Sequence, residues 1–204
     1  MDLPGHGGDS TPVESVTFQH YVDRALEAVR ASDAPAILVG HSMAGAIVRE
    51  AAGLAPAGIR AIVSVASLLP REGASMLSLV EGFDPEYLAQ ILWAEDGRSA
   101  RLSEEGARRF FLALCPPAAV EAALPLLTPE PALPYETPLA YSDAGVPHYY
   151  IECWQDRVVP IALQRSMHAG FPADRIYGLD TDHAPFFSRP EEFAMILHRI
   201  AERD

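Results

Sequence analysis

Short apolar runs bounded by turn residues alternate along the chain with segments of helical periodicity. The apolar runs have the length and the β-branched or aromatic content of buried strands, the last of them more weakly than the others. They are residues 36–39, 61–66, 148–154 and 175–179. Apolar positions recur at helical spacing in residues 18–30, 44–55 and 191–201. Because strands alternate with helices, the pattern predicts an α/β fold with a mainly parallel sheet.

One interval breaks this alternation. Residues 68–138 contain helical patterns at 85–93 and 103–114, followed by a connection with five prolines between Pro125 and Pro138. Proline and the residue before it favour extended backbone, so the connection is expected to be extended. The pattern predicts a helical cap over residues 68–138, inserted into a core formed by residues 1–67 and 139–204.

The stretch LVGHSMAGAIV, residues 38–48, places Ser42 between a strand and a helix. A serine at such a sharp turn is the arrangement of a nucleophile elbow, in which its neighbours Gly40 and Ala44 must be small. The helix that follows directs its free N–H groups at the reacting centre, so the Met43 N–H is the candidate oxyanion donor. The alternative is that Ser42 only caps this helix, since serine is a favoured N-cap residue.

A base and an acid follow the later strands. His183 lies after the strand 175–179, and Asp156 lies just beyond the strand 148–154. Loops that leave the carboxyl ends of parallel strands gather at one edge, which brings both residues towards Ser42. His183 is then expected to take the serine proton while Asp156 orients the imidazole. Asp180 and Asp182 compete for the acid role, but neighbours in a tight loop rarely orient an imidazole correctly.

Taken in order, five segments resemble the α/β-hydrolase superfamily, and within it the small esterases akin to plant methyl-salicylate esterases, hydroxynitrile lyases and their bacterial relatives. The segments are DLPGHG (2–7), GHSMAG (40–45), LLPREGAS (68–75), DRVVP (156–160) and DHAPFFSRP (182–190). The resemblance implies a cofactor-free hydrolase of small esters. Ala44 replaces the second glycine of the usual elbow. Ala184 stands where the cyanogenic lyases carry lysine, which argues against a lyase.

The function that follows is a serine hydrolase of the carboxylesterase kind, cleaving small apolar or aromatic esters through an acyl-enzyme. Two alternatives remain: acyl transfer, lactonisation or other non-hydrolytic biosynthetic chemistry on the same triad, or a catalytically weak protein that binds ligands. Apolar cap residues are candidates for the pocket wall, although core packing competes as an explanation for each of them. They are Leu69, Phe83, Tyr87, Trp93, Phe110, Phe111 and Leu114.

Members of this family carry a strand ending in a His-Gly loop, then a helix and another strand, ahead of the segment resembling DLPGHG. The present sequence begins at that segment. The resemblance therefore implies an N-terminally truncated sheet in which Met43 supplies half of the oxyanion hole. An open sheet edge invites pairing with another chain, so we expect weak turnover and either a homo-oligomer or a marginally stable protein.

The amino-acid composition limits the partners, location and cofactors that are expected for this protein. The 204 residues carry a formal net charge of -13, which disfavours nucleic acids and anionic membranes as partners. No apolar run approaches the roughly 20 residues of a membrane span, and no signal peptide is evident, so a cytoplasmic location is expected. There is no lysine, which excludes Schiff-base chemistry within the chain. Cys115 and Cys153 lack metal-site spacing and are expected to be buried free thiols, with no metal or cofactor.

Overall fold

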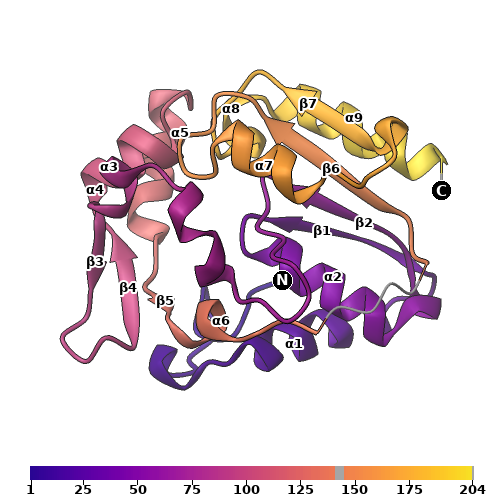
Figure 1. The fold of residues 1–204 in the computed structure, drawn as a ribbon, viewed down its shortest axis with the longest axis horizontal. Coiled ribbons are helices and arrows are strands. Elements are labelled where there is room, and N and C mark those ends of the chain that lie inside the picture. Colours follow the sequence, from indigo (N-terminus) through magenta and orange to yellow (C-terminus); the bar gives the residue numbers. More distant parts are fainter. Residues whose placement is uncertain (141–144, 204) are drawn as a thin grey trace.

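A four-stranded parallel sheet forms the centre of the fold in the computed structural model, which describes residues 1–140 and 145–203. Its strand order is β1-β2-β6-β7, and every neighbouring pair is parallel (Figure 1). The strands are β1 (Ala36–His41), β2 (Ile59–Val65), β6 (His148–Cys153) and β7 (Ile176–Leu179). All four correspond to the apolar runs of the sequence, so the predicted α/β fold with a mainly parallel sheet is confirmed.

Helices cover both faces of this sheet. On one face, α1 (Phe18–Arg30) and α2 (Ala44–Leu54) bury apolar side chains such as Tyr21, Val22 and Ile47 against the sheet. On the other face, α9 (Pro190–Arg203) packs Ile200 in a cluster with residues of β2, β6 and β7. The central strands β2 and β6 are buried at nearly every position, and such strands are expected to be largely apolar, which is why their runs were recognisable in the sequence.

The helix boundaries follow from local chemistry. The side chain of Thr17 accepts the N–H of His20, and the side chain of His20 accepts the N–H of Thr17, which closes a capping box at the start of α1. Helix α2 begins one residue after Met43, directly behind the turn that contains Ser42. The predicted helices at 18–30, 44–55 and 191–201 therefore agree with α1, α2 and α9 to within a few residues at each end.

The cap differs from its prediction. It contains a three-stranded antiparallel sheet in the order β3-β4-β5, seen at the left of Figure 1, besides short helices. The segment expected to be helical at 85–93 is only partly so, because the chain leaves helix after Leu88 and enters β3. The elements are α3 (Pro85–Leu88), β3 (Ile91–Trp93), β4 (Ser99–Leu102), α4 (Glu104–Gly106), a π-helical turn (Ala107–Phe111), α5 (Pro117–Ala123), β5 (Glu130–Pro131) and α6 (Leu133–Glu136).

Two further short α-helices follow the strands β6 and β7 in the chain. They are α7 (Ile161–Met167) and α8 (Pro185–Ser188).

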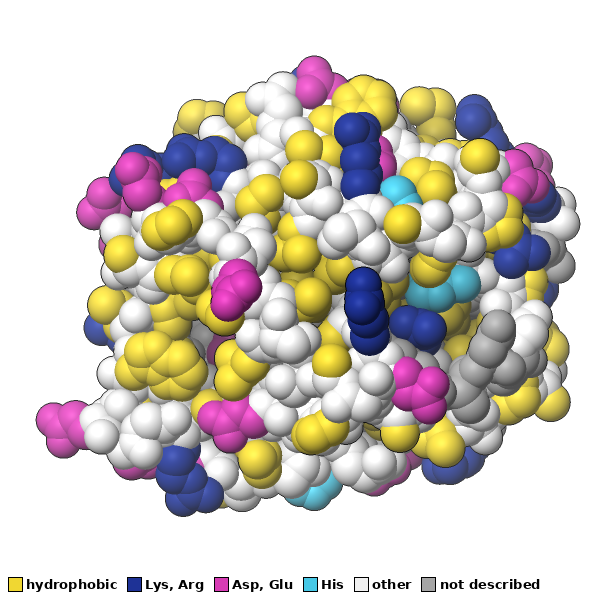
Figure 2. Space-filling model, in the orientation of Figure 1, with side chains coloured by type: hydrophobic (Ala, Val, Ile, Leu, Met, Phe, Trp, Pro, Cys, Tyr) yellow, Lys and Arg dark blue, Asp and Glu magenta, His cyan; other side chains and the backbone are white. Residues whose placement is uncertain are grey.

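On the face of the molecule shown in Figure 2, hydrophobic side chains reach the surface near the middle and are interspersed with charged ones. No helix within residues 1–140 and 145–203 is both long and apolar enough to cross a membrane.

Candidate active site

Ser42 occupies a strained turn at the carboxyl end of β1. Its φ is 54°, a left-handed conformation that residues other than glycine rarely adopt. Backbone hydrogen bonds on both sides hold the turn: the Ser42 N–H donates to the Val65 oxygen at 3.0 Å, and the Leu68 N–H donates to the Ser42 oxygen at 3.0 Å. The backbone therefore projects the serine hydroxyl from the end of the sheet, as a nucleophile elbow does.

Two glycines allow this turn to be so tight. A Cβ on Gly40 would lie 2.3 Å from the Ala44 oxygen, so residue 40 must be glycine for strand and helix to approach. A Cβ on Gly45 would lie 2.3 Å from the Cβ of Ser67 in the neighbouring loop. The crowding expected between residues 40 and 44 is therefore present, and the role of Gly45 was not foreseen.

Met43 follows the serine and is the N-cap residue of α2, with its side chain 7% exposed. The first N–H groups of a helix have no carbonyl partner within the helix and carry its positive dipole end. The Met43 N–H thus lies at the position from which an elbow stabilises an oxyanion.

His183 and Asp156 lie in contact at the ends of β7 and β6. The His183 Nδ1 and the Asp156 Oδ2 are 2.7 Å apart, and both side chains are completely buried. The other carboxylate oxygen, Oδ1, accepts the N–H groups of Val158 at 2.7 Å and Val159 at 2.8 Å. These bonds hold the carboxylate in the orientation that fixes the imidazole with its proton on Nδ1.

The two competing acids point elsewhere. The Oδ2 of Asp182 accepts the Leu114 N–H at 2.7 Å, which ties the cap to the loop that carries His183. The exposed Asp180 accepts the side-chain amide of Gln155 at 2.7 Å. Asp156 is therefore the only one of the three predicted candidates whose carboxylate meets the His183 ring among the described hydrogen bonds.

Ser42 and His183 share no hydrogen bond in this structure, within the residues it describes. The Nε2 of His183 is buried and has no hydrogen-bond partner among those residues, so its lone pair is unoccupied when the proton is on Nδ1. Contacts between a catalytic base and its nucleophile are often long without ligand and shorten in the reacting complex. In the structure the predicted acid, Asp156, therefore contacts the predicted base, His183, at Nδ1, and no described residue forms a hydrogen bond with Nε2.

His41 contacts the base directly, which the sequence analysis did not anticipate. Its Nε2 lies 2.7 Å from the carbonyl oxygen of His183, and the two ring centroids are 4.4 Å apart. A carbonyl only accepts, so Nε2 carries the proton of the His41 ring. Burial, with the neighbouring His183 as a smaller cause, lowers the pKa of His41 well below its ordinary value. The only sequence signal was its position beside Ser42.

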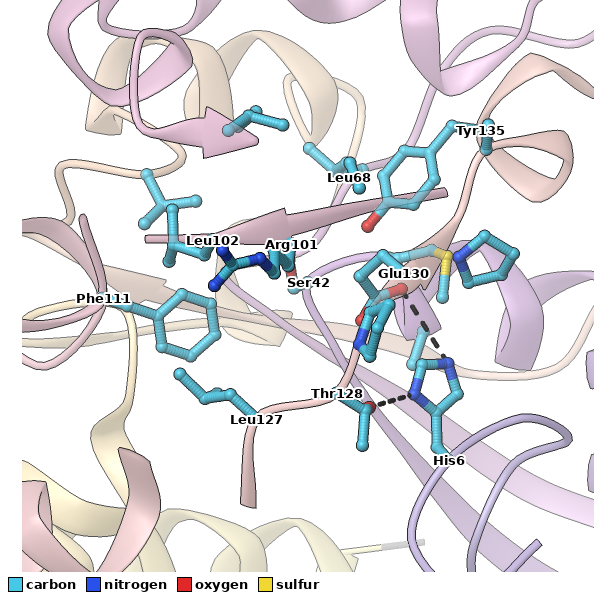
Figure 3. A pocket seen from close by; sticks show the side chains of 18 of the residues that line it. His6, Ser42, Leu68, Arg101, Leu102, Phe111, Leu127, Thr128, Glu130 and Tyr135 are labelled. Carbon is cyan, nitrogen blue, oxygen red and sulfur yellow. Dashed lines mark hydrogen bonds and ion pairs between the residues drawn. The ribbon is translucent and has the colours of Figure 1, made fainter. Parts of the chain in front are cut away.

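A cavity of about 1170 Å³ lies between the sheet edge and the cap, and Ser42 and Met43 form part of its wall (Figure 3). Four of the cap aromatics proposed from the sequence line it: Phe83, Tyr87, Trp93 and Phe111. Phe110 is instead fully buried in the core. The cavity also receives Glu130 of β5, another residue that sequence reasoning missed. Its only signal was an acidic residue set between two prolines.

Within the described parts of the chain, no three His, Cys, Asp or Glu residues are grouped to hold a metal ion. Both cysteines are free thiols, Cys153 fully buried and Cys115 partly exposed. Burial is the main cause that raises the pKa of Cys115 to about 12, which disfavours its thiolate. These thiols are therefore poor nucleophiles, and Ser42 remains the reactive candidate in the cavity.

The parallel sheet, the strained serine turn and the buried acid–histidine pair define an α/β-hydrolase, and the chain belongs to the alpha/beta hydrolase family, whose model matches residues 1–196. Among curated proteins, it is 27% identical to a pyrethroid hydrolase of Sphingobium wenxiniae, over 98% of this chain and 76% of that protein. It is also 27% identical to methylesterase 7 of Arabidopsis thaliana, over 100% of this chain and 85% of the relative.

The fold comparison agrees. A crystal structure of a pyrethroid hydrolase from Sphingobium faniae JZ-2 matches with a TM-score of 0.83 and 26% identity, covering 98% of this chain and 84% of the other. The predicted resemblance to small esterases of this superfamily is thus confirmed, and so is the expectation of an enzyme of the esterase class.

Proposed function

We propose that the protein hydrolyses small carboxylic esters through an acyl-enzyme on Ser42, with His183 as the base and Asp156 as the residue that orients it. The observation that carries the assignment is the 2.7 Å contact between Asp156 and His183, which leaves the buried Nε2 of His183 without a hydrogen-bond partner among the described residues. A neutral imidazole in this tautomer can accept the serine proton.

The reaction proceeds in two steps. The Ser42 oxygen attacks the ester carbonyl while its proton moves to the Nε2 of His183, and the Met43 N–H stabilises the negative oxygen that forms. His183 then returns the proton to the departing alcohol, which leaves an acyl group on Ser42. Water deprotonated by His183 attacks this acyl group, and His183 returns the proton to the Ser42 oxygen as the bond to the acyl group breaks and the carboxylic acid leaves. Asp156 stabilises the imidazolium in both steps without itself taking the proton.

The substrate class follows from the cavity wall. Phe83, Trp93 and Phe111 present aromatic surface to the space beside Ser42, which favours an apolar or aromatic acyl or alcohol group. The names of the relatives, a pyrethroid hydrolase and a methylesterase, support esters as the substrates. The proposal includes a cytoplasmic location, for which two free thiols are suited to a reducing compartment.

Covalent labelling tests the assignment. Treatment with a fluorophosphonate, followed by intact-mass analysis and peptide mapping, should give one adduct on Ser42. The same protein should release p-nitrophenol from p-nitrophenyl butyrate, and Ser42→Ala should lose both the adduct and the turnover. Labelling at another residue, or turnover that survives in Ser42→Ala, would overturn the proposal.

A further inference from the structure

Glu130 places a carboxylate in the wall of the cavity that contains Ser42 (Figure 3). Its side chain is 47% exposed, whereas the Oε2 atom is covered and has no hydrogen-bond partner within the described residues. Burial raises the pKa of this carboxyl to about 7. Buried polar atoms in folded proteins are almost always paired, so a cavity-lining carboxylate that has one covered oxygen without a partner favours a ligand that brings a positive charge to the carboxylate.

The nearest histidine does not supply that partner. The Nε2 of His6 lies 3.9 Å from the Glu130 Oε2, too far for a hydrogen bond. Both nitrogens of this ring are already engaged, Nδ1 with the Thr128 hydroxyl and Nε2 with the Tyr21 hydroxyl, each at 2.7 Å. Burial also lowers the pKa of His6, which disfavours its charged form. His6 therefore supports the wall beside Glu130 without neutralising the carboxylate.

Arg101, labelled in Figure 3, also lines the cavity. It forms no ion pair with Glu130 among the interactions of the described residues. Apart from the approach of His6 at 3.9 Å, the Glu130 carboxylate has no ion pair among the described residues.

Aromatic rings accompany the carboxylate. Tyr87 and Tyr135 line the same cavity, and the charge of Glu130 acts on both phenols. After burial, which is the larger cause, that charge contributes to raising the pKa of Tyr87 to about 12 and the pKa of Tyr135 well above its ordinary value. Tyrosine faces attract cations, and a carboxylate next to such rings is suited to an ammonium group.

We propose that Glu130, with Tyr87 and Tyr135, forms a subsite for a protonated amine at the end of the substrate remote from the ester. This inference rests on the proposed ester hydrolysis and adds a substrate class to it, namely amino esters. The ammonium donates hydrogen bonds to the accessible part of the Glu130 carboxylate, and the ring faces contact its charged end. The net charge of -13 further favours cationic over anionic substrates.

The test compares methyl esters of ω-amino acids of increasing chain length with the matching ω-hydroxy and unsubstituted esters. The rate of hydrolysis of each ester is measured by pH-stat titration. At the best chain length, the amino ester should have a KM lower than that of the unsubstituted ester by roughly tenfold or more, as expected for a charge-assisted hydrogen bond. Glu130→Gln should remove this preference, so that the amino ester and the unsubstituted ester have similar KM values in the variant. The matched control is Glu104→Gln, because Glu104 lines the same cavity but is paired with Arg108 at 2.9 Å.

Equal KM values for the three ester series in the wild-type protein would overturn the subsite while ester hydrolysis stands. So would a preference for the hydroxy ester that Glu130→Gln retains. Should no ester be cleaved, the proposed function fails instead, and calorimetric titration of Ser42→Ala with hexylamine and with hexanol decides about the subsite separately. If hexylamine binds more tightly than hexanol and the Glu130→Gln substitution abolishes this difference, the subsite is supported. Equal affinity for the two ligands contradicts the subsite.

Discussion

The Nδ1 of His183 and the Oδ2 of Asp156 lie 2.7 Å apart with both side chains fully buried, although the two residues belong to loops after different strands. Parallel strands bring these loops to one edge of the sheet, which is why residues of such distant loops meet there. The contact holds one imidazole nitrogen and leaves the other, Nε2, facing no acceptor or donor of the described chain. This one-sided arrangement is the basis of the predictions on activity.

Asp156→Asn should lower kcat by about 10⁴-fold, because an amide in this position favours the wrong imidazole tautomer. Asp182→Asn should instead weaken the acceptor for the Leu114 N–H and destabilise the fold by about 1–3 kcal/mol, with a much smaller loss of kcat. Steady-state kinetics and thermal unfolding of both variants separate the two effects. The control is the exposed Asp180→Asn, and near-normal turnover in Asp156→Asn would show that another group orients the base.

His41→Phe should lower kcat roughly tenfold with little change in KM, because the variant loses the hydrogen bond to the His183 carbonyl but keeps a ring against the base. His41→Gln can still donate from its amide and should recover part of the loss. The control for removal of an imidazole is His198→Phe on the exposed side of α9. An equal kcat in His41→Phe and the wild-type protein would exclude a positioning role for His41.

Gly40→Ala should destabilise the protein by about 1–3 kcal/mol and reduce esterase activity together. The added Cβ would meet the Ala44 oxygen at 2.3 Å, so the turn around Ser42 must shift. The matched control is Gly170→Ala, since nothing lies within 4 Å of a Cβ at that position. Calorimetric unfolding of both variants measures the difference, and equal melting temperatures would contradict this account of the elbow.

The large sheet was predictable because its strands are short, largely apolar runs, and the central strands β2 and β6 are buried at nearly every position. The small cap sheet was not, because β3, β4 and β5 have only three, four and two residues. Strands this short carry too few alternating positions to be told from a helical turn. The proline-rich connection was likewise expected to be extended, whereas it contains the short helix α6 besides β5.

The placement of Ser42, Asp156 and His183 beyond the strand ends was predictable from chain order. The site was not predictable where a side chain acts through residues far along the chain. His41 meets the carbonyl of His183, and Glu130 faces a cavity whose wall includes His6. Neither contact leaves a periodic or spaced pattern in the sequence, so only the folded arrangement reveals it.

Self-association remains a prediction from the sequence, and the sheet indicates where to test it. Strand β1 pairs only with β2 among the described residues, and Val39 on it is 43% exposed. A strand edge without a partner can pair with another chain. We expect the average mass from light scattering to rise with protein concentration, and Val39→Lys to reduce that rise. Leu126→Lys, in an exposed part of the cap, is the control. A monomer at every concentration would contradict the prediction.

His148 should make the fold sensitive to acid. It lies on β6, with Nε2 2.8 Å from the Ser64 hydroxyl and its ring 4.5 Å from that of Phe171. Burial, followed by the charges of Arg49 and Arg175, lowers the pKa of His148 to about 3. In the unfolded chain the same ring has a pKa of about 6.5. Between these values the unfolded state binds a proton that the folded state does not.

Stability from this residue is therefore complete above about pH 6.5 and is lost as the pH falls towards 3. By pH 4 the loss should be about 2–3 kcal/mol, after allowance for partial exposure of the ring. His148→Gln keeps an amide beside the Ser64 hydroxyl and does not titrate, so its stability should depend less on pH over this range. Urea unfolding of both proteins at several pH values measures the difference, with the exposed His198→Gln as control. Because other acid-sensitive groups, such as Glu152 with its lowered pKa, are common to both proteins, parallel curves would mean that His148 is protonated in the folded state without penalty.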